Sequence, residues 1–508
     1  MCCIAGSING DLRLVKKMIS SMRHRGPDDE NFFSKENVSL GMGRLKILDL
    51  ISENLCLYSN EDLVLSYNGE VFNYLEVKKE LISKGFKFQT TGDTEVLAKA
   101  WQCWGVKSLD KLNGMFAFSI YDKKNHKLYL VRDIAGEKPL YYYEYGNKFY
   151  FASETKALKN ILNLNYKKNN FFDSFQHCLI STLWKDLKQI PAAHYLELDI
   201  KKNNKKLVEY WKFKKKKIYL KTVQEEFDEL LKSSVKMRTK SDVPYGLYYS
   251  KGIDSSLISS YHKFKNKLYF NDKKDWKKDF FKNIKKITYF LDLPVGSLSS
   301  YPLWKLGETA RKKKLKVILS GEGADEIFGG YVRYMPLYNE WILKKKFKSY
   351  SYLFNKFYKN DITAFSLITA RNENIELVKS FVKPYFEMFE DDPINAMGFF
   401  DFKTVMPSLL QMGDRMAAAH SIENRCPFLD KRIIEFGFNL PWYFKINDYE
   451  QKKILRGLLR KKSMLEPLYK EKKGLSIIYN KWLNRDDWDR SNYFNLVNKN
   501  WKKAYKIK

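Results

Sequence analysis

The chain has 508 residues, of which 44% are hydrophobic and 30% charged, so it is long enough for two or more packed domains. Its formal net charge is +32, but the basic runs "KFKKKKIYLK" and "ARKKKLK" are short and separated, which favours solvated lysine-rich faces over nucleic-acid binding as a primary role. The 6 cysteines form no C-x-x-C pair, which argues against a disulfide framework and a zinc knuckle.

The amino-terminal stretch and the hydropathy pattern indicate the compartment. The first residues, "MCCIAGSINGDLRLVKKMIS", lack the basic-then-apolar order of a signal peptide. No apolar run is long enough to cross a bilayer. We therefore expect a cytoplasmic protein without a membrane partner.

The first 200 residues are rich in predicted strands. Aromatic and β-branched runs, separated by turns with Asn, Gly and Asp, predict strands over 63–69, 115–122, 127–133, 138–153 and 194–200. Apolar residues at helical spacing, with a Gly at the end, predict helices over 74–85 and 93–105. This half is expected to be α+β with a largely antiparallel sheet.

A polar, basic stretch then separates the strand-rich region from a region in which predicted strands and helices alternate. Residues 201–221 have no clear period and are interpreted as a linker. The segment 222–239 predicts an amphipathic helix that opens at Thr222, with acids in its first turn. Apolar strands follow, each with a Gly-rich loop and a helix behind it, which indicates a parallel sheet; the last third is helical.

One strand-loop-helix unit has the features of a phosphate site. The apolar run Val243 to Tyr249 ends in Ser250-Lys251-Gly252-Ile253-Asp254-Ser255-Ser256, before a predicted helix. A helix N-terminus and serine hydroxyls offer donors to phosphate, and Gly252 allows close approach of an anion. The alternative is a plain corner capped by Asp254 or Ser255.

A second such unit adds acidic residues. Leu315 to Leu319 predicts a buried strand, followed by Ser320-Gly321-Glu322-Gly323-Ala324-Asp325-Glu326. Ligands bind at this end of strands in open α/β sheets. Carboxylates beside a phosphate site indicate an intervening Mg²⁺, whereas the alternative is an acidic helix start.

Four motifs make the chain resemble the glutamine-dependent asparagine synthetases. The family's S-G-G-x-D-S loop corresponds to Ser250–Ser255, and S-G-E-G-x-D-E-x-F-G-G-Y is intact over 320–331. "DRMAAAHSIENRCPFLD" over 414–430 and K-x-x-L-R over 452–456 complete the set. The resemblance implies an N-terminal α+β four-layer N-terminal-nucleophile glutaminase sandwich and a C-terminal α/β parallel-sheet PP-loop domain with additional helices. We expect the glutaminase at 2–200, the linker at 201–221 and the ATP-dependent synthetase-like domain at 222–508.

The resemblance assigns the glutaminase residues. Met1 is expected to be removed, so that the Cys2 thiol is the nucleophile and its free α-amine, with an ordinary pKa near 8, the general base. Cys3 has no such amine and is expected to be a buried, inert strand residue. The implied partners of glutamine are Arg44 for the carboxylate, Asn68 and Gly69 for the oxyanion, and Glu70 and Asp93 for the amino group. The segment 23–29 and His420 are interpreted as structural.

The resemblance also assigns the synthetase residues. The substrates would be ATP, as its Mg²⁺ complex, and a carboxylic acid that is activated as an acyl-adenylate with release of pyrophosphate. Glu322 would orient ammonia or the acceptor, and Asp254 and Asp325 would hold Mg²⁺. The expected pyrophosphate and ATP contacts are Ser250, Gly252, Asp254, Ser255, Ser256, Ser320, Gly321, Asp325 and Lys452.

Three departures from the family pattern keep alternatives open. Lys251 stands where the family has glycine, Leu293 replaces the carboxylate of L-D-E-P, and the segment 257–290 is short. The expected acceptor is aspartate, with AMP and pyrophosphate released. The alternatives are a relative that amidates another carboxylate, of a surface sugar or secondary metabolite, and a scaffold with a decayed synthetase half. A homodimer is an open expectation for the assembly.

Overall fold

The structure is a computed structural model, and it describes residues 1–52, 55–167, 182–271, 275–295, 297–335, 337–339, 383–389, 392–469 and 490–507. The predicted antiparallel half is present as two six-stranded sheets. The first has the order β10-β8-β9-β1-β3-β2, with bounds Lys188–Gln189, Tyr141–Tyr145, Lys148–Ala152, Cys3–Ile8, Val38–Arg44 and Asp29–Lys35. The second has the order β12-β11-β7-β6-β5-β4, with bounds Asn204–Glu209, His194–Asp199, Lys127–Arg132, Gly114–Asp122, Leu63–Val71 and Tyr58–Ser59.

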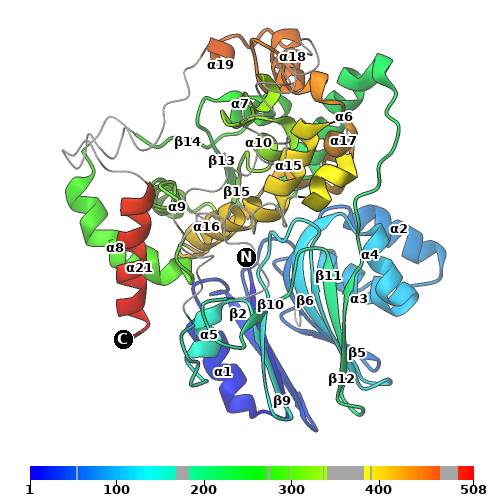
Figure 1. Ribbon diagram of the computed structural model, residues 1–508. Helices are drawn as coiled ribbons and strands as arrows, with labels where there is room; N and C mark the ends of the chain where they lie inside the picture. The colour runs from blue at the N-terminus through cyan, green and yellow to red at the C-terminus, as the bar shows by residue number, and fades with distance from the viewer. Residues whose placement is uncertain are drawn as a thin grey trace.

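The two sheets face each other, and helices cover their outer faces (Figure 1). Side chains alternate along β1: Ile4 and Ile8 enter the cluster between the sheets, while Cys3 and Ala5 face α1 (Leu12–Ser21) and α5 (Thr155–Lys159). The other outer face packs on α2 (Tyr74–Ser83), α3 (Asp93–Trp104) and α4 (Ser108–Lys111). The period of two in these strands therefore accounts for the layers on both sides of the first sheet.

The predicted linker is wrong in part, because residues 204–209 form β12. This strand pairs antiparallel with β11, from His194↔Glu209 to Asp199↔Asn204. Its residues are mostly exposed and polar, so the sequence carries no alternating pattern there. The rest of the predicted linker, 210–221, leads into the second half through the short helix η3 (Leu220–Thr222).

The second half contains the predicted parallel sheet. Its order is β14-β13-β15-β16, with bounds Lys267–Leu268, Tyr245–Tyr248, Val317–Leu319 and Glu423–Arg425. The three pairings are parallel. Leu247 and all of β15 are fully buried, as expected for strands covered on both faces.

Helices surround this sheet and carry its loops. The two phosphate-site strands lead into α7 (Ile253–Tyr261) and α10 (Ala324–Phe328). The other α-helices are α6 (Val223–Arg238), α8 (Lys277–Leu291), α9 (Ser300–Lys312), α15 (Pro393–Thr404), α16 (Met406–Ala418), α17 (Lys431–Asn439), α18 (Lys453–Lys461), α19 (Glu466–Tyr469) and α21 (Arg490–Ala504). Short 3₁₀ turns are η1 (Gly105–Lys107), η4 (Pro427–Leu429) and η5 (Trp442–Phe444).

The amino terminus lies where the two halves meet (Figure 1). Met1 is fully buried in the large cluster that also holds Leu45 and Ile47 of the first half and the parallel-sheet core of the second. The predicted nucleophile next to Met1 is therefore placed at the boundary between the halves.

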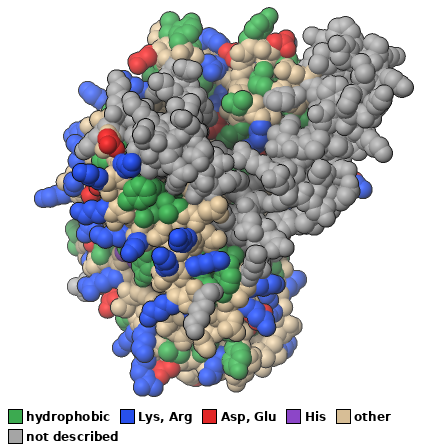
Figure 2. All heavy atoms as spheres, turned by 60° about the vertical axis from the view of Figure 1, so that its left-hand side comes forward, with side chains coloured by type: hydrophobic (Ala, Val, Ile, Leu, Met, Phe, Trp, Pro, Cys, Tyr) green, Lys and Arg blue, Asp and Glu red, His purple; other side chains and the backbone are tan. Residues whose placement is uncertain are grey.

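None of the described helices combines the length and apolar character needed to cross a membrane. On the face drawn in Figure 2, Lys and Arg side chains are dispersed among apolar and uncharged atoms and do not form one continuous stripe.

Candidate active site

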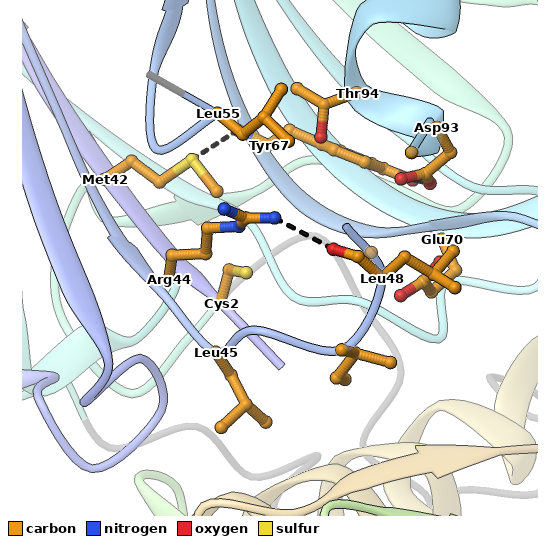
Figure 3. A pocket seen from close by; sticks show the side chains of 13 residues that line it. Cys2, Met42, Arg44, Leu45, Leu48, Leu55, Tyr67, Glu70, Asp93 and Thr94 are labelled. Carbon is orange, nitrogen blue, oxygen red and sulfur yellow. Dashed lines mark hydrogen bonds between the residues drawn. The ribbon is translucent and has the colours of Figure 1, made fainter. Parts of the chain in front are cut away.

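One pocket in the first half is lined by five of the residues predicted to bind glutamine or to act on it. Cys2, Arg44, Gly69, Glu70 and Asp93 all line it. Cys2 and Arg44 lie on one side of the pocket, and the carboxylates of Glu70 and Asp93 lie on the opposite side (Figure 3). The pocket can therefore hold a ligand with a carboxylate at one end and an ammonium group at the other.

Cys2 and Asn68 are joined by a hydrogen bond. The backbone N–H of Cys2 donates to Asn68 Oδ1 at 3.0 Å. Asn68 Nδ2 is buried and has no hydrogen-bond partner among the described residues, so this donor is available to a ligand. Gly69 has φ +152, and a Cβ there would lie 2.1 Å from the Met115 carbonyl oxygen, so glycine is required at this position.

Arg44 is fixed by one nitrogen, while another has no partner among the described residues. Its Nη2 donates to the carbonyl oxygens of Leu48 and Asp49, both at 2.9 Å. Its Nη1 is buried without a described partner. A buried, unpaired guanidinium nitrogen beside Cys2 suits the carboxylate of a ligand.

The two acids across the pocket differ in their partners. Asp93 Oδ2 accepts hydrogen bonds from the Tyr67 hydroxyl at 2.7 Å and from the Val71 N–H at 2.8 Å. Glu70 Oε1 lies 3.1 Å from Arg425 Nη2 of the second half. Burial, followed by the nearby Asp93, raises the pKa of Glu70 well above its ordinary value, and Arg425 opposes this shift.

Met1 occupies the other side of Cys2. Its amino group lies 3.4 Å from the Glu423 carboxylate on β16. Burial would raise the pKa of Glu423, but the Met1 amino group and Arg425 lower it to about 2. Burial raises the pKa of the Cys2 thiol, and the Met1 amino group partly offsets this.

The first phosphate-type loop follows β13. The hydroxyls of Ser250 and Ser255 lie 3.1 Å apart, and Gly252 N–H donates to Ser250 Oγ at 3.1 Å. Lys251 has φ +59, the left-handed conformation that favours the glycine of the family pattern. Ser256 is fully buried in the first turns of α7. The loop is thus a compact turn with its hydroxyls close together.

The second loop lies directly against the first. A Cβ on Gly321 would meet Asp254 Cβ at 2.9 Å, so the two loops touch there. Lys452 Nζ lies 2.7 Å from Asp254 Oδ1 and 2.7 Å from Asp325 Oδ1. Burial lowers the pKa of Lys452, but the two carboxylates outweigh it and raise this pKa above its ordinary value. The two predicted metal-binding acids therefore converge on one cationic position.

Glu322 contacts residues of the 414–430 motif. Its Oε2 lies 3.8 Å from Cys426 Sγ. Burial raises the pKa of Glu322, and hydrogen bonds with Ser320, Asn424 and Cys426 moderate the rise. Ser320 Oγ itself lies 3.6 Å from Cys426 Sγ.

Arg425 is the residue that sequence reasoning missed. Its guanidinium faces Glu70, and its carbonyl oxygen accepts the N–H of Ser320 at 3.0 Å. It stands inside the 414–430 motif, but a motif does not show which distant residue a side chain meets. Arg425 therefore contacts both the pocket lined by Cys2 and the loop that follows β15.

A buried ion network joins the halves nearby. Arg25 donates to Glu154 at 2.9 Å and to both oxygens of Asp414 at 2.8 and 3.1 Å, and its Nε donates to the Cys2 carbonyl oxygen at 3.1 Å. Asp414 also accepts from Arg415 at 2.7 Å. The segment 23–29 thus contributes an interdomain contact, which fits its predicted structural role.

Two other predicted positions lie outside both sites. Leu293 is buried in the apolar cluster with Trp184 and Trp501, so the replaced carboxylate position packs into a core. His420 packs on Trp304, with ring centroids 4.5 Å apart, and burial lowers its pKa to about 4. Cys178 falls outside the described residues.

Comparisons with known proteins identify the family of each half. The glutamine amidotransferase domain family matches residues 1–211, and the asparagine synthase family matches 226–270 and 272–495. The chain is 30% identical to glutamine-hydrolysing asparagine synthetase 1 of Bacillus subtilis, over 94% of this chain and 86% of that protein. It is 33% identical to a Methanocaldococcus jannaschii protein provisionally named glutamine-hydrolysing asparagine synthetase 2, over 68% of this chain and 78% of that one.

Proposed function

Since the chain belongs to the family of glutamine-hydrolysing asparagine synthetases, we propose that it takes ammonia from glutamine in the first half and amidates a carboxylic acid in the second. The observation that supports this proposal is that Arg425 contacts Glu70 of the pocket through its guanidinium and Ser320 of the second loop through its carbonyl oxygen. The proposed fold assignment is an N-terminal-nucleophile glutaminase sandwich followed by a PP-loop synthetase. Because β12 pairs within the second sheet, we include it in the first domain, so that the proposed linker covers residues 210–221 only.

In the glutaminase, removal of Met1 turns the Cys2 nitrogen into an α-amine. That nitrogen already lies against Asn68 Oδ1, so its position is set by the fold. The amine takes the thiol proton, the thiolate sulfur attacks the glutamine amide carbon, and the protonated amine gives its proton to the departing ammonia. Water then hydrolyses the thioester and releases glutamate.

The remaining pocket residues position the substrate. The free Nη1 of Arg44 binds the α-carboxylate, and Glu70 with Asp93 binds the α-ammonium group. Asn68 Nδ2 and the Gly69 N–H stabilise the negative charge that develops on the amide oxygen when the thiolate attacks. The α-ammonium group favours the ionised form of Glu70, which offsets the effect of burial on its pKa.

In the synthetase, the two loops after β13 and β15 bind ATP. Ser250, Ser255 and the α7 N-terminus hold the phosphates, together with Ser320 at the second loop. The convergence of Asp254 and Asp325 on one cationic position fits a Mg²⁺ ion, which would neutralise phosphate charge when bound. Lys452 neutralises the same phosphates from the protein side. Glu322 orients the nitrogen or the acceptor.

The expected acceptor is aspartate, and the reaction is proposed to take place in the cytoplasm. The test is an amidotransfer assay with glutamine, ATP and a panel of carboxylic acids, in which glutamate, amide, AMP and pyrophosphate are measured. Aspartate-dependent release of AMP and pyrophosphate, with asparagine formed, supports the proposal. Amide formation with another acid would move the acceptor to that acid, and no release with any acid would refute the synthetase activity.

A further inference from the structure

A loop of the first half, residues 45–49, holds Arg44 in its place at the pocket. Arg44 Nη2 donates to the carbonyl oxygens of Leu48 and Asp49, both at 2.9 Å, and Figure 3 draws the bond to Leu48. Asp49 has φ +54, a left-handed conformation that persists in a residue with a Cβ when neighbouring contacts hold it. The direction of the carbonyl group that fixes Arg44 therefore depends on the contacts of Asp49.

The side chain of Asp49 bonds the opposite wall of the same pocket. Its Oδ2 accepts the N–H groups of Thr91 at 2.7 Å and of Gly92 at 3.2 Å, directly before Asp93. Its Oδ1 accepts the Ser52 N–H at 2.9 Å. Burial would raise the pKa of Asp49, but hydrogen bonds from Ser52 and Thr91 lower it below its ordinary value. Asp49 thus contacts the carboxylate-binding end of the pocket through its carbonyl oxygen and the ammonium-binding end through its carboxylate.

Asp242 of the second half bonds this loop at two points. Its Oδ2 accepts the Asp49 N–H at 2.8 Å, and its own N–H donates to the Ile47 carbonyl oxygen at 3.0 Å. Ile47 is buried in the cluster that contains the parallel-sheet core of the second half. Asp242 lies shortly before β13 and is not among the described residues that line the pocket. Its influence on a bound ligand therefore acts through the loop.

We propose that Asp242 is a positioning residue by which the second half sets the affinity of the first half for glutamine. This inference rests on the proposed function, which places glutamine in this pocket. Without the Oδ2 acceptor the Asp49 N–H loses its partner in the second half, and the left-handed conformation is less restrained. The carbonyl group that holds Arg44 is then less well fixed, so the guanidinium binds the α-carboxylate of glutamine less tightly.

The kinetic signature of this role follows from where Arg44 acts. The α-carboxylate takes no part in the reaction at the amide group, so its binding stabilises the bound substrate and the transition state equally. Loss of such binding raises KM and leaves kcat unchanged. Asp242 is exposed, so water replaces part of the lost hydrogen bond, and the effect should be moderate.

The test compares Asp242→Ala and Asp242→Asn with the wild type, and Asp275→Ala is the matched control. Asp275 is an exposed acid of the second half whose Oδ1 accepts the Lys277 N–H at 2.9 Å. In Asp242→Ala we expect KM for glutamine to rise about three- to tenfold, the loss expected for one hydrogen bond, with kcat for glutamate release unchanged. Asp242→Asn keeps an oxygen acceptor and should stay close to the wild type, as should Asp275→Ala. Ammonium-dependent amide formation should be the same in all four proteins, which shows that they are folded.

An unchanged KM in Asp242→Ala, or an equal rise in Asp275→Ala, would overturn the positioning role. A wild type that does not hydrolyse glutamine would instead refute the proposed function. In that case hydrogen–deuterium exchange of the Asp49 amide, measured without ligand, decides the matter. Faster exchange in Asp242→Ala than in Asp242→Asn supports the role of Asp242 in holding the loop, and equal exchange rates overturn it.

Discussion

The Glu70 carboxylate of the glutamine pocket lies 3.1 Å from the Arg425 guanidinium on β16. Arg425 also accepts the Ser320 N–H at 3.0 Å through its carbonyl oxygen, so it touches both sites. Arg425 therefore contacts the glutamine pocket with its side chain and the start of the synthetase loop with its backbone. This contact gives a direct physical link between the two halves.

Glu70→Gln should impair glutamine binding without disturbing the synthetase. The variant removes the charge that meets the α-ammonium group, while Arg425 keeps Glu423 at 2.9 Å and the fold is preserved. A charged hydrogen bond contributes about 1.5–3 kcal/mol, so KM for glutamine should rise roughly 10- to 100-fold. Steady-state kinetics with glutamine and with ammonium chloride measures this. Glu76→Gln, on the exposed side of α2, is the control, and an unchanged KM in Glu70→Gln would refute the role.

Lys251→Gly should stabilise the protein. The lysine has φ +59, a conformation that costs about 1–2 kcal/mol for a residue with a Cβ. The extra freedom of glycine in the unfolded chain offsets about half of this gain, which leaves about 1 kcal/mol. Denaturant unfolding measures the change. Lys314→Gly, at φ +56 on the exposed end of α9, should gain a similar amount, and a gain at Lys314 alone would show that the loop is not strained.

Many elements could be predicted from the sequence because their pattern is local. The strand expected from Val243 to Tyr249 contains β13, and the helix expected over 222–239 contains α6. β12 was missed because its polar, exposed residues become a strand only by pairing with β11. The contact of Arg425 with Glu70 joins residues far apart in the chain. Such contacts depend on how the halves pack, which no local pattern encodes.

Lys452→Gln should abolish ATP use and expose a cation site. In the wild type the Lys452 ammonium lies between Asp254 and Asp325, 2.7 Å from each. Without it, the two carboxylates face each other, so Mg²⁺ without nucleotide should raise the melting temperature of the variant more than that of the wild type. Thermal unfolding with and without MgCl₂ tests this, with Lys453→Gln as the control. Equal shifts in variant and wild type would contradict the shared cation position.

Asp414→Asn should weaken the boundary between the halves in a pH-dependent way. Burial would raise the pKa of Asp414, but Arg25 and Arg415 lower it to about 2. Because this pKa lies below the ordinary value of about 4, the stability it contributes is present above pH 4 and is lost as the pH falls towards 2.

At pH 7 the variant should therefore lose about 3–5 kcal/mol of unfolding free energy, the cost of breaking a buried ion pair. At pH 2 its stability should approach that of the wild type. Denaturant unfolding at both pH values measures the difference. Asp28→Asn breaks the more exposed pair with Lys316 and should cost about 1 kcal/mol or less. A loss at Asp414 that does not change with pH would argue against the ionised network.

The most direct measurement is the nitrogen-donor specificity of Cys2→Ala. Amide formation is followed with glutamine or ammonium chloride as donor, and glutamate release is followed with glutamine alone. Glutamate release should fall at least about a thousandfold, because the nucleophile is gone, while ammonium-dependent amide formation stays at the wild-type rate. Cys3→Ala, which alters the buried neighbouring thiol, should retain both activities. Glutamine hydrolysis at the wild-type rate in Cys2→Ala would contradict the account.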